Sequence, residues 1–546
     1  MRQRRLDNRP GAPPFRRSIR GVIRHLPRPT RARLLAPALL LLLLALVASG
    51  CGGSSKASVG GGGGADPASV APPGTALFLS ANVRPQGTQQ ANLEQVGGAI
   101  LATTDFNAEV RRLLSSSTKG ARDLIFERDV QPGLGDRLAL ALPSFTARGE
   151  GLMIAATNDD GQARTSLQRA IPGAQSATYL GTDYVHSADG KHAAAVVDHL
   201  ALYGSEADVK RAIDASQGTS LGETPAYTRA TSSLPGDALA TGYLDLRNAI
   251  ASAGAAAGQG ATTGALSSIL GKDLAGVGLG AYADADAVRL EVAVPGSGAL
   301  GGTIAGGDAS ASLLTAPAGA WLGLGLGNVG KTLNHLLDGI AGGGITGIGV
   351  QAILAQAEQS IGLDIRKDLL AWMGPAHLFV SGTTRSTVGG ALVVHSTDPA
   401  ATRHAVRRLA TAIPRLMPKA ALAPLPARFA ATGFSVRVGT STRAFVVSKG
   451  DTFVIAIGAR ALKQARDPRG RLGDDPGFKA IAGKLNGAKP VLYLDLQQVA
   501  DLASALGGAK AQGAVDILHR FTQLAAGGKA EGDVSRATVV AGVKVK

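Results

Sequence analysis

Apolar and polar residues follow two different periods along this chain, and the two kinds of segment alternate. "AVRLEVAV" at 287–294 alternates apolar and polar positions at period two, which predicts a half-buried strand. "DADA" at 284–287 predicts a hairpin turn into that strand. By contrast, "QARTSLQRAI" at 162–171 and "AATRHAVRRLA" at 400–410 place apolar residues every three or four positions, as amphipathic helices do. The chain therefore mixes strands and helices.

Aspartates mark the expected helix starts. Asp159 and Asp398 lie two or three residues before the two amphipathic segments, and Asp245 and Asp495 lie in the strand-like "YLDL" blocks. An aspartate at such a position accepts hydrogen bonds from the first free N–H groups of a helix, so we predict four N-caps. Strands that pair as hairpins, with helices inserted irregularly, predict an α+β fold with largely antiparallel sheets rather than a doubly wound parallel sheet.

Several blocks of sequence occur twice in the same order, which is the strongest architectural signal in the chain. The repeated blocks begin at residues 71 and 316, 128 and 367, 151 and 390, and 221 and 472, and "YLDL" at 243–246 recurs unchanged at 493–496. We therefore predict two homologous tandem α+β domains, at 74–300 and 301–546, each with a largely antiparallel sheet packed against helices.

The first fifty residues have the composition of a targeting segment. Residues 1–33 hold eleven Arg, and residues 34–47 form an apolar run too short to span a bilayer comfortably. The run ends in "VASGC", whose Cys51 is the only cysteine in the chain. This order resembles the signal of bacterial lipoproteins, with residues 47–51 as the lipobox. The resemblance implies a diacylglyceryl group on the Cys51 thiol, cleavage before Cys51, and acylation of the new amino terminus, so we predict a signal peptide over 1–50.

The expected processing changes the charge of the protein. The full chain has a formal net charge of +16, but residues 1–50 hold eleven of its 56 basic and one of its 40 acidic residues, which leaves 45 and 39, or +6. That charge gives no reason to expect a nucleic-acid partner. Residues 51–73 are rich in Gly, Ser and Pro and predict a flexible tether from the extracytoplasmic face of the cell membrane to the first domain.

One stretch matches a nucleotide-binding pattern. "GLGNVGKT" at 325–332 contains Gly325, Gly330, Lys331 and Thr332 in the spacing of a phosphate-binding loop. Export would remove the site from cytoplasmic ATP, and the corresponding "LSANVRPQG" of the first repeat lacks Gly-Lys-Thr. We therefore interpret the stretch as a structural turn and predict no cofactor.

Other candidate chemistry is sparse. His186, His192 and His199 lie close together in the sequence, but a hairpin would not bring three of them to one metal ion, so we expect exposed histidines and no metal site. The chain has no G-x-S-x-G or H-E-x-x-H motif, and we predict no catalytic residue.

The blocks "PPGTALFLSANVRPQG" at 72–87, "DVQPGLGDRLALAL" at 129–142 and "YLDL" resemble a bacterial family of secreted proteins and lipoproteins known as a domain of unknown function. The resemblance implies the repeated architecture and no activity. The leading hypothesis is a lipid-anchored, non-catalytic binding or scaffold module at the cell envelope, whose partner is another envelope protein or a ligand held between the domains. The alternative is a carrier of lipid or another apolar ligand in a cleft between or within the domains. A nucleotide-binding enzyme is the third hypothesis.

Overall fold

The computed structural model describes residues 65–109, 112, 133–144, 151–171, 173–249, 276–296, 307–342, 355–356, 358–359, 362–416, 420–426, 429–438, 442–508 and 512–545. The predicted signal peptide, Cys51 and most of the tether lie outside these residues. Within them, no helix is long and apolar enough to cross a membrane.

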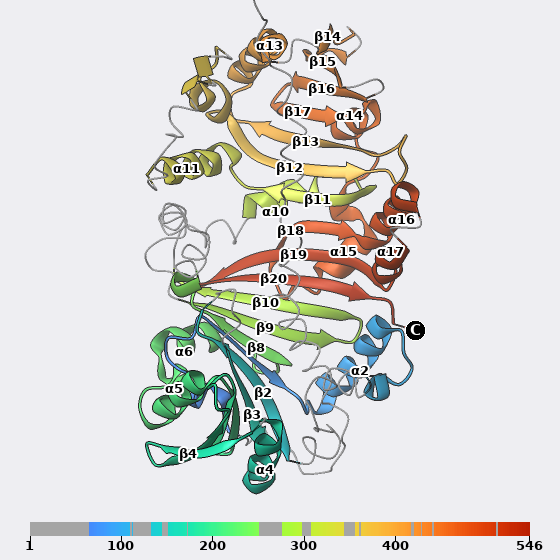
Figure 1. Cartoon of the computed structure of the whole chain (residues 1–546). Coiled ribbons are helices and arrows are strands. Elements are labelled where there is room, and N and C mark those ends of the chain that lie inside the picture. Colours follow the sequence, from blue (N-terminus) through green and yellow to red (C-terminus); the bar gives the residue numbers. More distant parts are fainter. Residues whose placement is uncertain are drawn as a thin grey trace, which may run out of the picture.

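One antiparallel sheet of 20 strands runs through the described residues (Figure 1), which confirms the α+β class with antiparallel pairing. The strands of the first half are β1 (Leu77–Asn82), β2 (Leu134–Leu142), β3 (Leu152–Thr157), β4 (Gln175–Tyr179), β5 (Thr182–His186), β6 (Ala193–Val197), β7 (Leu200–Gly204), β8 (Ala240–Leu244), β9 (Val277–Asp284) and β10 (Ala287–Pro295). Those of the second half are β11 (Ala320–Leu326), β12 (Met373–Ser381), β13 (Gly389–Ser396), β14 (Ala421–Pro424), β15 (Thr432–Val438), β16 (Thr442–Lys449), β17 (Thr452–Ile457), β18 (Lys489–Asp495), β19 (Phe521–Glu531) and β20 (Val534–Val543).

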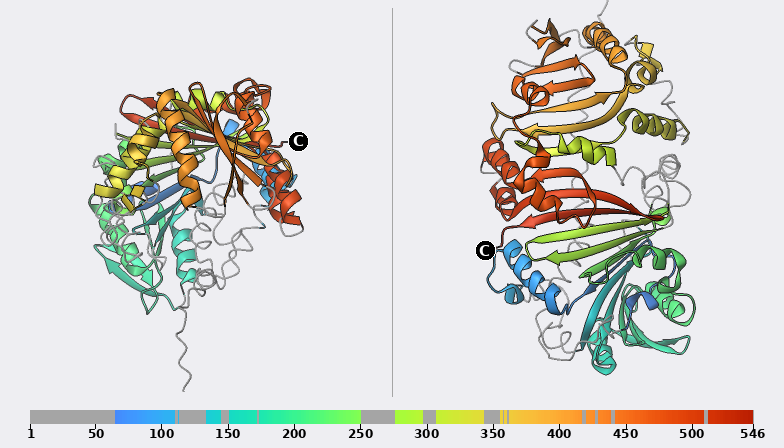
Figure 2. Two further views of the ribbon diagram at one scale, coloured as in Figure 1. Left: turned by 90° about the horizontal axis from the view of Figure 1, so that it is seen from above. Right: turned by 180° about the vertical axis from the view of Figure 1, so that it is seen from behind.

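The strand order is the same in both halves. The first half runs β4–β5–β6–β7–β3–β2–β1–β8–β9–β10. The second runs β14–β15–β16–β17–β13–β12–β11–β18–β19–β20. The two halves join where β10 pairs antiparallel with β20, with Glu291 opposite Thr538 near the middle. Seen from behind, the sheet continues from one half into the other at this pair (Figure 2).

Helices cover both faces of the sheet. They are α2 (Gly87–Leu101), α4 (Asp160–Ala170), α5 (Glu206–Gln217), α6 (Pro225–Thr231), α10 (Gly307–Leu314), α11 (Val329–Gly342), α13 (Pro399–Leu416), α14 (Ala459–Arg466), α15 (Pro476–Ala482), α16 (Leu496–Gly507) and α17 (Gln512–Leu518), with short helices η3 (Pro67–Ser69), η6 (Leu221–Glu223), η7 (Ile365–Leu370) and η9 (Leu472–Asp474).

Directly paired residues of an antiparallel sheet share a face, so the register divides the strand positions into two sets. We call the set that contains Phe78, Tyr243, Phe379 and Tyr493 face A, and the alternate set face B. Face A packs against α5 and α6 in the first half and against α10, α14 and α15 in the second.

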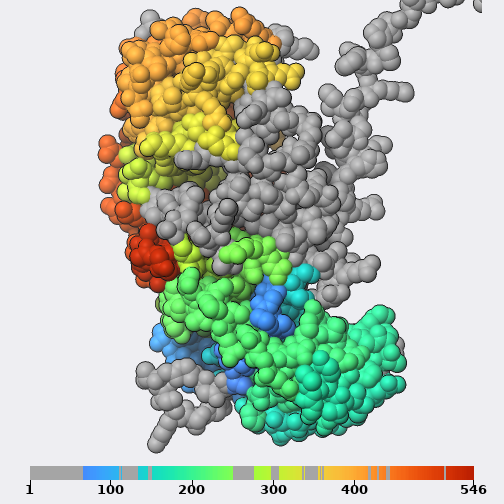
Figure 3. Space-filling view, turned by 90° about the vertical axis from the view of Figure 1, so that its left-hand side faces the viewer, coloured from blue at the N-terminus to red at the C-terminus, as the bar shows by residue number. Residues whose placement is uncertain are grey.

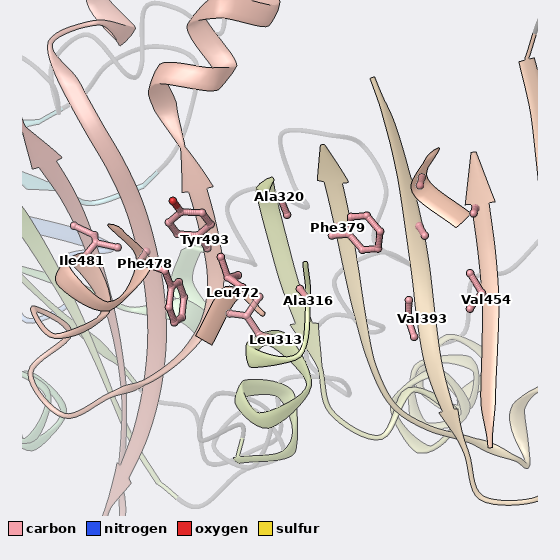
Figure 4. Packing of buried hydrophobic residues seen from close by; sticks show 14 of the residues in the cluster. Leu313, Ala316, Ala320, Phe379, Val393, Val454, Leu472, Phe478, Ile481 and Tyr493 are labelled. Atoms are coloured by element: carbon pink, nitrogen blue, oxygen red, sulfur yellow. The ribbon is translucent and has the colours of Figure 1, made fainter. Parts of the chain in front are cut away.

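The main core of the second half lies on face A (Figure 4). Phe379 is fully buried there, and Phe478 of α15 meets Tyr493 edge to face with ring centroids 5.4 Å apart. Leu313 of α10 and Leu472 fill the space between these rings and β11. Dense packing of large apolar side chains against one face fixes the sheet in place.

All four predicted N-caps are confirmed. The carboxylates of Asp159, Asp245, Asp398 and Asp495 accept hydrogen bonds of 2.9–3.1 Å from backbone N–H groups two or three residues later. The hairpin turn is confirmed as well, because β9 ends at Asp284 and β10 begins at Ala287.

The strand "AVRLEVAV" has the reverse of the usual orientation, in which polar side chains face water. The polar side chains of Arg289 and Glu291 are buried on face A, with exposed fractions of 12% and 2%, while Leu290 on face B is 42% exposed. β10 lies in the middle of the sheet, where the second half covers face A and supplies polar partners. Arg289 pairs with both Glu291 and Asp284, and Asn486 donates to Glu291 at 3.2 Å. Ion pairing thus replaces water around these charges, and the apolar side of the strand faces outward.

Candidate apolar binding site

Face B carries a hollow of about 240 Å³ over β1, β8, β9 and β10. The face-B side chains around it come from all four strands and are apolar or absent: Leu79, Ala81, Ala240, Gly242, Leu279, Ala281, Leu290 and Val292. The hollow lies in the first half and includes β10, the strand that joins the halves.

Small residues in the middle of these strands create the space. Ala240 and Ala281 are direct cross-strand partners, and Gly242 stands opposite both Leu79 and Leu279. A Cβ atom at Gly242 would lie 2.8 Å from Leu79 Cδ2 and 3.2 Å from Leu279 Cβ. The leucines therefore close over the glycine and form the rim, while the alanines leave the centre open.

The opposite face of the same strands is closely packed. Tyr243 is buried on face A against Tyr227, with ring centroids 5.5 Å apart, and burial raises the pKa of its hydroxyl to about 12. Arg289 lies over the Tyr282 ring, 4.3 Å from its centroid. The strands thus form a supported floor, and the nearby charges point away from the hollow.

The hollow offers an apolar ligand contact without hydrogen bonds. Ser80, Thr241 and Glu291 border it, but their side chains belong to face A. Its volume is below the roughly 300–1,000 Å³ typical of pockets for drug-sized ligands. A slender hydrocarbon chain fits both the size and the lining, whereas a charged or hydrogen-bonding group would lose its water without replacement.

Face B has further exposed apolar side chains beyond the hollow. Met153 is 49% exposed, Leu290 42%, Ile455 39% and Ile457 54%. Large exposed apolar side chains on one sheet face are typical of surfaces that bind a ligand, a membrane or another protein.

In this structure, the glycines of the nucleotide-binding pattern allow close backbone packing, and the residues beside them begin α11. A Cβ atom at Gly325 would lie 1.9 Å from the carbonyl oxygen of Ala309, and one at Gly330 would lie 2.1 Å from that of Leu370. Asn328 caps α11, because its side chain accepts from the Lys331 N–H at 2.9 Å. The Thr332 hydroxyl donates to the Asn328 carbonyl at 2.9 Å, and β11 is antiparallel to both of its neighbours.

This packing predicts effects of different size for two substitutions in the motif. Gly325→Ala forces the new methyl group into backbone, so we expect a loss of about 1–3 kcal/mol in the free energy of unfolding. Lys331→Ala, at an exposed position, should change it by less than about 0.5 kcal/mol. Guanidinium unfolding of both variants checks this. Micromolar binding of ATP–Mg²⁺ that Lys331→Ala abolishes would contradict the structural interpretation of the motif.

The three clustered histidines have separate neighbours. The Nδ1 atom of His186 lies 3.0 Å from the Ser187 carbonyl oxygen, and that of His192 lies 3.1 Å from the Tyr203 hydroxyl oxygen. The Nδ1 atom of His199 lies 3.2 Å from a carboxylate oxygen of Asp160. Within the described ranges, no group of three or more His, Cys, Asp or Glu could hold a metal ion.

Sequence reasoning did not identify the residues of the hollow. The available signal is the alternation of small residues in "ATGYL" at 240–244 and "VGLGAYAD" at 277–284. These small residues form a hollow only because β8 and β9 pair with each other and lie between β1 and β10. That strand order cannot be predicted from the local sequence.

Comparison with known proteins places the chain in a family. The family described as "Protein of unknown function (DUF3352)" matches residues 34–515. The chain belongs to this family. The predicted resemblance to a domain of unknown function is therefore confirmed for DUF3352, and no curated protein matches the chain.

Among solved structures, this DUF3352 chain is similar to three crystal forms of TP0453. Form I has 11% sequence identity and a TM-score of 0.25, and the match covers 43% of this chain and 79% of TP0453. Forms III and IV each have 13% identity, with TM-scores of 0.24 and 0.23, over 42% of this chain and 80% of TP0453.

Proposed function

We propose that this protein is a lipid-anchored, extracytoplasmic binding protein that holds the hydrocarbon chain of a lipid on face B. The observation that carries the proposal is the hollow over β1, β8, β9 and β10, whose face-B side chains are all apolar. Such a surface binds by removing hydrocarbon from water, which requires neither a catalytic group nor a cofactor.

The membrane anchor is the second part of the proposal. The ordered series of basic segment, short apolar run and lipobox supports acylation at Cys51. Two or more acyl chains hold a protein stably at a bilayer, whereas one chain binds only reversibly. A tether over 51–73 would keep the sheet near a supply of lipid.

We also infer that the two halves are tandem copies of one domain. Support comes from the repeated blocks and from the identical strand order of β1–β10 and β11–β20. The halves meet near Glu291 and Thr538, which the pairing places opposite each other.

The anchor is tested by Cys51→Ala. We expect the variant to leave the membrane fraction, because the thiol is the predicted attachment point for the diacylglyceryl group. Fractionation of cells that express each form, with immunoblotting, measures the result, and Ser54→Ala in the tether is the matched control. Membrane association that persists in Cys51→Ala would contradict the anchor, even if purified protein still binds lipid.

A further inference from the structure

β4 is the terminal strand of the sheet in the first half and lies at one end of the molecule, as β14 does at the other (Figure 1). Among the described strands, β4 pairs with β5 alone. The β4–β5 hairpin closes through Leu180 and Gly181, both with positive φ, so Tyr179 and Thr182 form its first hydrogen-bonded pair. The backbone groups of Ser176 and Thr178 consequently point away from β5.

The outer edge of β4 lacks the features that usually protect a sheet edge. Proline, lysine and shortening are common protections against the addition of another strand. β14 has two of them, because it is four residues long and ends in Pro424, which has no N–H. β4 is five residues long, "QSATY", with neither proline nor lysine.

A pocket of about 360 Å³ lies directly beneath this edge, on face B. Ser176 and Thr178 of β4 line it together with Asp183 of β5 and with Arg164 and Leu167 of α4. The helix α4 has no buried residue, so it does not fill this space. Figure 3 shows the teal end of the molecule that contains these elements.

The second half fills the corresponding space. There α13 packs against Phe434, Val436, Val446 and Phe453, all buried on face B of β15–β17. On the corresponding strands, the first half lines the pocket with Asp183, Val185, Ala194 and Val196, and no phenylalanine is among the lining residues. The open pocket is therefore a property of one half, next to the unprotected edge of that same half.

We propose that β4 and this pocket bind an extended segment of a partner protein, which adds to the sheet as its next strand. A row of unpaired N–H and C=O groups is complementary to another extended backbone. Every second side chain of the added strand would lie on the pocket side, beside Ser176 and Thr178. Arg164 lines the pocket and can pair with an acidic side chain of the added strand, while Asp183, which also lines it, accepts from the Thr178 hydroxyl at 2.9 Å.

The test uses the full chain and a pool of fluorescent heptapeptides with threonine at positions 1, 3, 5 and 7, glutamate at 4, and any residue at 2 and 6. We expect selected members to bind the wild type and Ser176→Ala alike. Ser176→Pro removes an outward N–H and should weaken binding at least about tenfold.

A second measurement needs no protein variant. N-methylation of the peptide amides that face β4 should abolish binding, whereas N-methylation of the alternate amides should not. The proposal is overturned if no peptide in the pool binds, if Ser176→Pro binds as well as the wild type, or if Ser176→Ala loses as much affinity as Ser176→Pro. It is also overturned if the edge instead pairs with a second copy, seen as a wild-type dimer in sedimentation that Ser176→Pro abolishes, or if only a lipid occupies the pocket.

Discussion

Replacing Glu291 with leucine is expected to lower the free energy of unfolding by about 3–5 kcal/mol, the cost of breaking a buried ion pair from one side. Glu291 is 2% exposed and pairs with Arg289, which is itself 12% exposed. The substitution would leave the guanidinium buried with Asp284 as its remaining carboxylate partner, at 3.3 Å. It would also remove the acceptor for Asn486, which lies in the second half. Guanidinium denaturation measures the effect.

The double variant Arg289→Met/Glu291→Leu is the control for this prediction. Replacement of both charges by apolar residues of similar size is often close to neutral, because no unpaired charge remains buried. We expect it to recover most of the stability lost in Glu291→Leu. A single variant as stable as the wild type would show that the pair does not hold the seam between the halves.

Ala281→Phe is expected to weaken the binding of a fluorescent fatty acid at least about tenfold, which corresponds to a loss of about 1.4 kcal/mol. Ala281 lies between Ala240 and Leu290 in the cross-strand register, in the middle of the hollow. A phenyl ring there would occupy the space proposed for the hydrocarbon chain. Fluorescence titration of the purified chain measures the affinity.

Ile457→Phe is the matched control. Ile457 is also an apolar residue on face B and is 54% exposed, but it lies on β17 in the second half, outside the residues that line the hollow. Its affinity for the probe should stay within about twofold of the wild type, well below a tenfold step. Equal losses in both variants would indicate binding to exposed apolar side chains in general rather than to the hollow.

Local features of the fold could be predicted from the sequence, because they depend on neighbouring residues. The N-caps at Asp159 and Asp398 and the turn after Asp284 require only short-range chemistry. The pairing of β10 with β20 joins residues far apart in the sequence, and no local pattern specifies it. The continuous sheet through both halves therefore could not be predicted from the sequence and is seen only in the structure.

The site depends on that same long-range pairing. An alternating pattern such as "AVRLEVAV" defines two faces of a strand but does not determine which face is buried. Because the second half covers Arg289 and Glu291, Leu290 is left on the outer side and contributes to the hollow. The nucleotide-binding pattern shows the opposite situation, in which residues match a sequence motif for a reason other than the function it suggests. Gly325 and Gly330 match the motif, but the structure requires glycine there because neighbouring backbone atoms leave no room for a side chain.

Native mass spectrometry of the full chain extracted from bacterial membranes tests the lipid-binding claim most directly. Acyl groups covalently attached at Cys51 would remain on the protein under collision, whereas a lipid held on face B would dissociate, so the two are separable. We predict one dissociable lipid per chain in the wild type and in Ile457→Phe, and its loss in Ala281→Phe. A wild type without dissociable lipid, or an Ala281→Phe variant that retains it in full, would contradict the account.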